Sequence, residues 1–173
     1  MAKKVEYTAT LSASSIKELQ RKLENYRDSL ENKCRRLAQA LAEDGVEIAK
    51  MQVSSLDAVF TGELMASIHS ADRGGAVFCV VTDSSHCLYV EFGTGIVGQQ
   101  SPYPYEFPEG ISWTYASGKT IRQLADGRYG WFYPGDDGRW YFTEGMPARP
   151  FMHNTAVELM GKVESKAKEI FGS

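Results

Sequence analysis

The stretch YVEFGTGIVGQQSPYPY, residues 89–105, decides how the middle of this chain is interpreted. Its glycines spell G-x-G-x-x-G, a pattern that in a dinucleotide-binding fold follows a strand and opens a helix. Two prolines follow directly, and proline removes backbone donors and favours extended conformations. The acidic residue expected about 20 positions later is missing, since residues 113–118 contain no acid. We therefore expect no nucleotide and no other cofactor here.

The composition is that of a globular protein. The 173 residues are 43% hydrophobic and 24% charged, which is enough for one domain, residues 1–173, with its own core. The net charge of -3 is too close to balance for a nucleic-acid binder. The charge is uneven, because residues 55–147 carry 5 basic and 11 acidic side chains. This asymmetry favours contact with a basic protein surface over contact with DNA.

Targeting signals are also missing from the sequence. The N-terminus, MAKKVE, lacks the apolar core of a signal peptide, and no run is long enough to span a bilayer. An odd number of cysteines, three, fits a reducing compartment better than a disulfide framework. We expect a soluble protein that is made and kept in a cytosol, away from membranes.

A long helix is predicted over residues 15–52. Ser15 and Glu18 form an S-x-x-E capping box at its start. Apolar residues then follow at spacings of three and four, which places them on one stripe of the helix: Ile16, Leu19, Leu23, Tyr26, Leu30, Cys34, Leu37 and Leu41. Such a stripe packs either on the domain's own sheet or against a neighbouring subunit, and the sequence leaves both alternatives open.

Two pairs of short strands are predicted from β-branched and aromatic runs. The first pair is residues 76–82 and 86–92, joined by the turn Asp83–Ser85. The second pair lies on either side of a turn at residues 134–138. Helix, strands and helix in this order predict an α+β fold, with a small antiparallel sheet or half-barrel between the helices.

The remaining predicted segments are an irregular insertion and a C-terminal helix. Residues 99–130 are rich in glycine, proline and aromatic residues, so we expect an irregular insertion with one helical turn near residues 120–125. The expected parts are a helix at 15–52, a β core at 61–98 and 131–147, the insertion at 99–130, and a C-terminal helix at 148–171.

The thiols and carboxylates form no catalytic or metal-binding pattern. Cys79 and Cys87 are expected opposite one another in the first strand pair as small buried hydrophobes. The two aspartates at 136–137 lack the spaced ligands of a calcium loop. Glutamates in loops are usually solvated charges, and we interpret three in this way: Glu91, Glu106 and Glu109. No catalytic residue and no metal site are predicted.

Aromatic residues are concentrated between residues 103 and 142. Strand alternation would bury about half of them. The others would face outward, where tyrosine and tryptophan are typical anchors of protein interfaces. Four in the insertion are the candidate interface: Tyr103, Tyr105, Trp113 and Tyr115.

Four motifs occur in a characteristic order. They are T-G-x-L-x-x-S-I at 61–68, Y-V-E-F-G-T-G at 89–95, W-Y-F-T-x-G at 140–145 and A-R-P-F-M at 148–152. Together they resemble the head–tail joining, or tail-completion, proteins of long-tailed bacteriophages and prophages. The resemblance covers residues 15–171, and the insertion is longer than this family leads us to expect.

The resemblance implies a non-enzymatic structural protein of the virion neck. Its subunits would form a ring that joins head to tail or completes the tail, in contact with other neck and tail proteins. It would be found in the virion, and in the host cytoplasm during assembly. The sequence leaves open whether the isolated chain is a monomer. The motif residues that the resemblance marks as structural are Thr61, Gly62, Leu64, Ile68, Glu91, Phe92, Gly93, Thr94, Gly95, Arg149, Pro150 and Phe151.

Two other functions remain open. The aromatic insertion also fits a carbohydrate- or cell-surface-binding module, because aromatic rings stack on sugars. A Cys–His nucleophile using His69 or His153 is the third alternative, although no local signature supports it.

Overall fold

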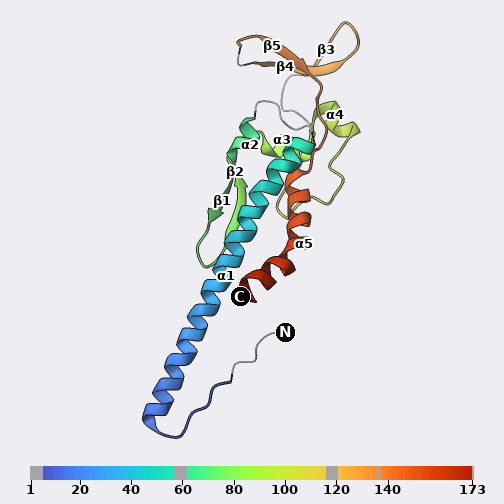
Figure 1. The fold of residues 1–173 in the computed structure, drawn as a ribbon. Helices are drawn as coiled ribbons and strands as arrows, with labels where there is room; N and C mark the ends of the chain where they lie inside the picture. Colours follow the sequence, from blue (N-terminus) through green and yellow to red (C-terminus); the bar gives the residue numbers. More distant parts are fainter. Residues whose placement is uncertain (1–5, 57–61, 116–120, 136, 173) are drawn as a thin grey trace. The chain divides into compact units, whose positions relative to one another are not determined.

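The computed structural model describes residues 6–56, 62–115, 121–135 and 137–172 (Figure 1). The fold is α+β, as predicted. In chain order the elements are α1 (Ala13–Ser55), α2 (Glu63–Ser67), β1 (Ile68–Asp72), β2 (Phe78–Thr82), α3 (Cys87–Phe92), α4 (Gly95–Gln100), β3 (Arg122–Gln123), β4 (Tyr129–Pro134), β5 (Trp140–Thr143), β6 (Gly145–Met146) and α5 (Phe151–Phe171).

Chain contacts divide the protein into two compact units, each built from separate stretches of sequence. Unit 1 comprises residues 1–46, 69–81 and 158–173, and unit 2 comprises residues 47–68 and 82–157. The single domain expected from the sequence stays a prediction. Among the described residues, no helix is long and apolar enough to cross a membrane.

Helix α1 begins two residues before the predicted range of 15–52. The Oγ of Ser12 accepts a hydrogen bond from the backbone N of Ser15 at 3.3 Å, so Ser12 caps the helix. Ser15 already lies inside the helix, where its Oγ accepts a bond from the N of Thr10. The predicted box at Ser15 and Glu18 is therefore wrong, because the helix begins earlier and Ser12 is its cap.

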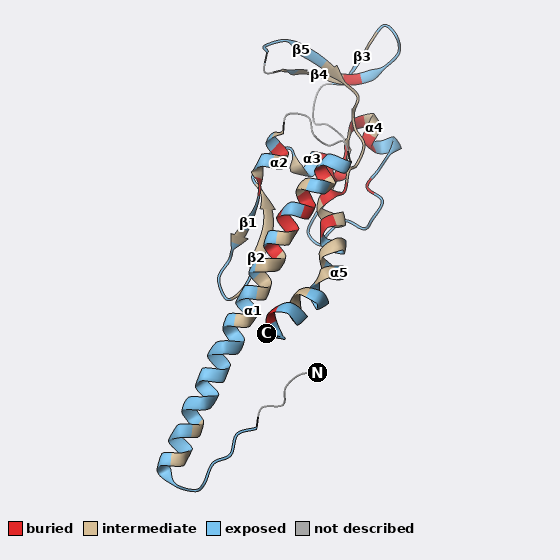
Figure 2. Cartoon of the chain, in the orientation of Figure 1, coloured by how far each residue is buried: buried red, intermediate tan, exposed pale blue. Residues whose placement is uncertain are grey.

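Burial changes sharply along α1, as Figure 2 shows. The second half carries much of the apolar core, whereas the first half is exposed on nearly every side. Exposed apolar side chains there include Ile16, Leu23, Tyr26 and Leu30. The predicted stripe is thus packed within the chain only in its second half.

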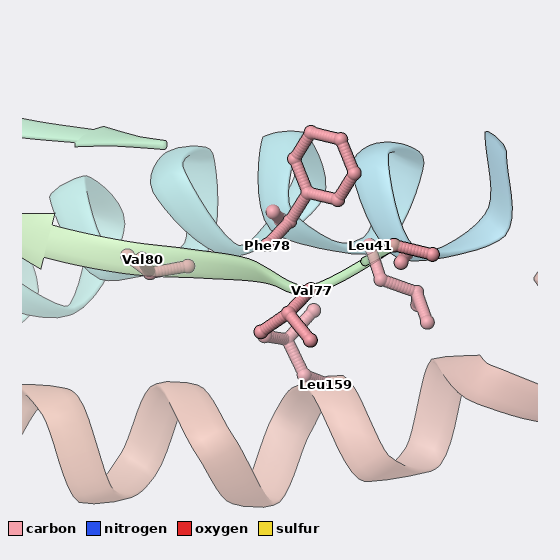
Figure 3. A pocket seen from close by; sticks show the side chains of 8 residues that line it. Leu41, Val77, Phe78, Val80 and Leu159 are labelled. Carbon is pink, nitrogen blue, oxygen red and sulfur yellow. The ribbon is translucent and has the colours of Figure 1, made fainter. Parts of the chain in front are cut away.

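Unit 1 packs β2 and the end of α5 against the middle of α1. Gly45 permits this approach, since a Cβ built there would lie 2.7 Å from Val80 and 2.8 Å from Leu159. An open groove of about 430 Å³ remains beside this contact (Figure 3). Its lining is entirely aliphatic or aromatic: Ala38, Leu41, Ala42, Ala76, Val77, Phe78, Val80 and Leu159. The groove therefore contains no group capable of acid–base or metal chemistry.

The second strand of the first predicted pair is in fact a helix. Residues 87–92 form α3, and Cys87 donates its N–H to the backbone O of Ser84. Val90, Glu91 and Phe92 are buried in succession, a pattern that a strand with alternating faces would not give. The hairpin at Asp83–Ser85 is therefore wrong, and among the described strands the partner of β2 is β1.

The insertion is irregular over residues 101–115, as predicted, but two of its details differ. Gly95–Gln100 form the short helix α4, which ends before the two prolines. Residues 122–123 form strand β3 rather than a helical turn, because they pair with β4 through Gly130 and Tyr129.

The second predicted hairpin is confirmed. β4 and β5 are antiparallel, with Trp131 opposite Thr143 and Pro134 opposite Trp140. With β3 they form a three-stranded sheet of order β3-β4-β5, separate from the β1-β2 pair. In the described part of the chain, β1–β5 therefore lie in two small sheets instead of the single sheet or half-barrel expected, and β6 is joined to residues 94–95 by isolated bridges.

Candidate assembly site

The Y-V-E-F-G-T-G motif turns the chain sharply at its first glycine. Gly93 has φ 79° and ψ 166°, a region that residues with a side chain seldom enter. A Cβ there would lie 2.7 Å from the backbone N of Ala148. The predicted role of the glycine, positive φ with close backbone approach, is confirmed, although the motif ends a helix rather than a strand.

The second glycine of the motif binds the chain to the last short strand. Thr94 and Gly95 form isolated bridges with Met146 and Gly145. Gly95 also has positive φ, 65°, and a Cβ on it would lie 2.5 Å from the backbone O of Glu144. The middle motif and the residues preceding A-R-P-F-M therefore lie backbone to backbone.

Glu91 connects the same two motifs through its side chain. Its Oε2 accepts a hydrogen bond from the N of Met152 at 2.9 Å, and its Oε1 accepts one from the N of His153 at 3.1 Å. These amides belong to the first turn of α5, where backbone donors lack helical partners. Glu91 on α3 therefore caps α5 and places a negative charge at the helix end that favours one.

Glu91 is only 6% exposed, so its interpretation as a solvated charge is wrong. The reason is tertiary: the first turn of α5 supplies the donors that water would otherwise provide. The interpretation holds for Glu106 and Glu109, which are exposed.

Arg149 completes the connection from the other side. Its backbone N donates to the O of Val90 at 2.8 Å, and its Nε donates to the O of Leu56 at 2.9 Å. Pro150 follows, and its O accepts the first helical bond, from the N of Asn154. Proline suits this position because the missing N–H would have had no helical partner. The A-R-P-F-M motif thus orients the start of α5 as predicted.

Glu91 makes the stability of the protein dependent on pH. Burial raises the pKa of its carboxyl above the ordinary value of 4.5, while the amides of Met152, His153 and Phe151 oppose this rise. A raised pKa means that the contribution of Glu91 to stability is fully present below pH 4.5 and is lost as the pH rises through the folded-state value.

We expect wild type to gain stability relative to Glu91→Gln, which cannot ionise, as the pH falls from 7 toward 4.5. Urea unfolding of both chains across this range measures the difference. A difference that stays constant with pH, or that grows as the pH rises, would contradict the cause given for the raised pKa.

The four candidate interface aromatics of the insertion do not share one environment. Tyr103 is 7% exposed, and its ring packs edge-on against Phe92 with centroids 4.9 Å apart. Trp113 is half-buried, and its Nε1 donates to the O of Gly93. Tyr115 accepts a hydrogen bond at its hydroxyl from the N of Tyr103. These three hold the insertion to the motif residues, so the expectation that Tyr103 faces outward is wrong.

Tyr105 is the exception among the four. Its side chain is exposed, and its ring stacks on His153 with centroids 3.7 Å apart. His153 also donates its backbone N–H to Glu91, so the ring lies above the capped end of α5. Contact between Tyr105 and a neighbouring protein stays a prediction.

A larger exposed aromatic surface lies on the β4–β5 hairpin. Phe132 and Phe142 are opposite one another on one face, with centroids 5.3 Å apart. Tyr133 and Tyr141 form a second pair at 5.9 Å on the other face. Trp140 at the hairpin end is 67% exposed. The sequence showed that these strands are rich in aromatic residues. Because side chains alternate between the two faces of a strand, we expected one of the faces to be buried.

The first motif lies partly outside the described residues. This applies to Thr61, the cap proposed for the short helix. Gly62 occupies the N-cap of α2 with φ 76°, and Leu64 and Ile68 are buried. The hydroxyls of Ser67 and Thr82 lie 2.6 Å apart, so this motif is packed into the chain and is not an exposed site.

The cysteines do not face one another as expected, because Cys87 begins a helix. Cys79 and Cys87 are each half-buried free thiols. Burial raises the pKa of the Cys87 thiol, which lowers its reactivity at neutral pH. Within the described parts of the chain, no three His, Cys, Asp or Glu side chains are grouped closely enough to hold a metal ion.

In comparisons with known proteins, no family model, no curated protein and no solved structure matches this chain.

Proposed function

We propose that this chain is a non-enzymatic assembly protein of a long-tailed bacteriophage or prophage. As a ring subunit at the virion neck, it would join head to tail or complete the tail end. The starting point is the resemblance carried by the four ordered motifs. The packing of three of them supports it, because Y-V-E-F-G-T-G contacts both the end of W-Y-F-T-x-G and the start of A-R-P-F-M.

The aromatic β4–β5 hairpin is the observation that carries the assembly role. A two-stranded hairpin is marginally stable in water unless further strands or another element support it, and the third strand here, β3, has only two residues. Here each face carries an aromatic pair with one exposed ring, Phe132 on one side and Tyr141 on the other. Such a two-sided aromatic surface is typical of a segment that is covered in a complex.

A ring gives both faces of this hairpin a partner. In cyclic assemblies the contacts are heterologous, so one patch of a subunit meets a different patch on the next. A hairpin inserted between neighbouring subunits, or between the ring and another neck protein, would bury both aromatic faces together.

The proposal is tested with the double variant Phe132→Ser/Trp140→Ser. We expect it to fold, because both side chains are exposed, and to fail to complement a phage that lacks this gene. Filled heads and free tails should accumulate unjoined, as counted by electron microscopy, while circular dichroism of the purified chain stays unchanged.

Arg139→Ser is the matched control, since Arg139 lies on the same hairpin with its side chain 82% exposed. It should complement normally. Infectious particles at wild-type yield from the double variant would contradict the role of the hairpin. Purified virions without this chain would contradict the function itself.

A further inference from the structure

The segment before α1 has the sequence pattern of a β-strand. Residues 6–11, EYTATL, alternate strictly between polar and apolar side chains, which is typical of a strand with one covered face. Tyrosine and threonine are also residues that strands favour. Yet these residues form neither helix nor strand, and every one of them is exposed, Leu11 completely so at 102%. In the described part of the chain, this segment therefore has a strand pattern without a sheet.

Strand β5 has an open edge. It is the outer strand of the β3-β4-β5 sheet, and among the described strands its partner is β4. The backbone O of Arg139 accepts a hydrogen bond from the N of Gly135 at 2.7 Å, so Arg139 faces β4. Backbone groups alternate in direction along such a strand, so those of Tyr141 also face β4, and those of Trp140 and Phe142 point to the open edge. Edges of this kind are templates for a further strand.

We propose that residues 7–10 of one copy pair with β5 of a second copy, as an additional strand antiparallel to β5. Tyr7 then lies opposite Phe142, and Ala9 lies opposite Trp140. The pairing rests on the proposed function, because it takes the hairpin as an assembly surface, and it adds the identity of the segment that covers β5.

The reach of the segment favours a second copy over the same chain. Residues 6–12 belong to unit 1 and the hairpin belongs to unit 2. Helix α1 rises about 51 Å from Ala13 to Glu47, where unit 2 begins, from 1.5 Å per residue. Extended chain can carry Ala9 at most about 14 Å from Ala13.

The open backbone groups of the segment select the phase of the pairing. The N of Thr10 donates to the Oγ of Ser15 at 2.9 Å, so the Thr10 amide is directed toward the start of α1. In an extended segment, alternation turns the backbone of Ala9 to the other edge. Joining the open groups of both strands places Ala9 opposite Trp140, while Thr10 keeps its bond to Ser15.

This phase also matches the side chains on both faces of the hairpin. One face is hydrocarbon, and Tyr7 and Ala9 would extend it: Phe132, Pro134, Trp140 and Phe142. Thr8 and Thr10 would extend the other face, where most side chains carry hydroxyls: Trp131, Tyr133, Tyr141 and Thr143. Apolar residues therefore join the apolar face, and threonines join the hydroxyl-bearing one.

The register follows from the sizes of the side chains. Tyr7 opposite Phe142 forms a cross-strand aromatic pair, a contact that stabilises sheets. It replaces the edge-on contact of Tyr7 with Tyr26, whose ring centroids are 6.5 Å apart. The small Ala9 leaves room for the indole of Trp140, which is 67% exposed.

Mixing two singly substituted chains tests the pairing between copies. Thr8 and Tyr141 would form a non-hydrogen-bonded pair, with Cα atoms about 4.5 Å apart, a separation that a disulfide spans. Both chains carry Cys34→Ser, because Cys34 is exposed. We expect mild oxidation of Thr8→Cys mixed with Tyr141→Cys to give a covalent species containing one chain of each kind. Each variant alone should stay monomeric on a non-reducing gel, and a mixture without the mixed species would overturn the pairing.

A second mixture tests the strand direction. In the antiparallel pair Thr10 lies opposite Arg139, so Thr10→Cys should cross-link with Arg139→Cys in the same background. A parallel strand with Thr8 opposite Tyr141 would set Thr10 opposite Thr143. Efficient cross-linking of Thr10→Cys with Thr143→Cys, and none with Arg139→Cys, would overturn the antiparallel register.

Sedimentation equilibrium measures the association itself. Ala9→Pro removes the N–H that would bond the carbonyl of Trp140, so it should weaken association at least tenfold. Thr8→Pro is the matched control and should associate like wild type, because the Thr8 amide points away from β5. Both residues are exposed and precede α1, so helix content should not change. A wild-type chain that stays monomeric at several hundred micromolar, or equal association of both variants, would overturn the proposal.

The failure of this pairing is distinguishable from failure of the proposed function. Loss of complementation by Phe132→Ser/Trp140→Ser, without cross-linking or association of the purified chains, would leave the assembly role of the hairpin and overturn the pairing. Cross-linking of Thr8→Cys with Tyr141→Cys, together with normal complementation by the double variant, would support the pairing and contradict the assembly role.

Discussion

Replacing Phe151 with alanine should lower the free energy of unfolding by about 3–5 kcal/mol, the usual cost of truncating a core phenylalanine. Phe151 is 0% exposed and is the largest fully buried side chain of the described residues. It is also the first residue of α5, directly beside the amides that Glu91 caps. The truncation would therefore leave a cavity where α5 is anchored to the motif residues.

Chemical denaturation of Phe151→Ala and wild type measures this loss. The matched control is Phe171→Ala at the other end of the same helix, where the side chain is 38% exposed. The control should cost well under half as much, because most of its ring surface is not removed from a packed environment. Equal losses from both variants would show that Phe151 is not a special anchor.

Replacing Gly93 with alanine should cost a comparable amount, roughly 3–5 kcal/mol, by adding backbone strain to a steric clash. At φ 79° and ψ 166°, a side chain is disfavoured even in open space. The new Cβ would also lie 2.7 Å from the N of Ala148 and 3.0 Å from the O of Met146. Those atoms are backbone, so they can move only if the junction between the two motifs separates.

The variant Gly110→Ala separates the backbone strain of a positive φ from the steric clash of a new Cβ. Gly110 also has positive φ, 81°, but a Cβ there meets no atom within 4 Å. We expect it to cost about 1–2 kcal/mol from strain alone. Thermal and urea unfolding of both variants give the comparison. If Gly93→Ala were no worse than Gly110→Ala, the close approach of Ala148 would carry no energetic weight.

Local sequence patterns predicted the elements whose signals are long or rich in turn residues. The apolar spacing of α1 predicted a helix that extends only a few residues further at each end. The aromatic runs around residues 134–138 predicted the β4–β5 hairpin. Proline and glycine predicted the start of α5 and the sharp turn at Gly93. These features depend on backbone sterics and periodicity within one segment, which is why the sequence suffices.

Short apolar runs were ambiguous for a physical reason. Residues 86–92 have the composition of a buried strand, yet they form α3 because Val90, Glu91 and Phe92 must all be buried at once. A strand would turn alternate side chains outward. For such a short run, length and composition alone do not distinguish a buried strand from a buried helix.

The sequence by itself determined the α+β class, the long first helix with its apolar stripe, and the glycines that only a turn or close approach explains. Only the tertiary structure decided which charges and aromatics are buried. Glu91 became a helix cap because the amides of Met152 and His153, some 60 residues later in the chain, replace its water. Tyr103 became core because Phe92 and Phe107 surround its ring, while the hairpin rings stayed exposed. Burial depends on which distant segments meet, and that information is in no single stretch of sequence.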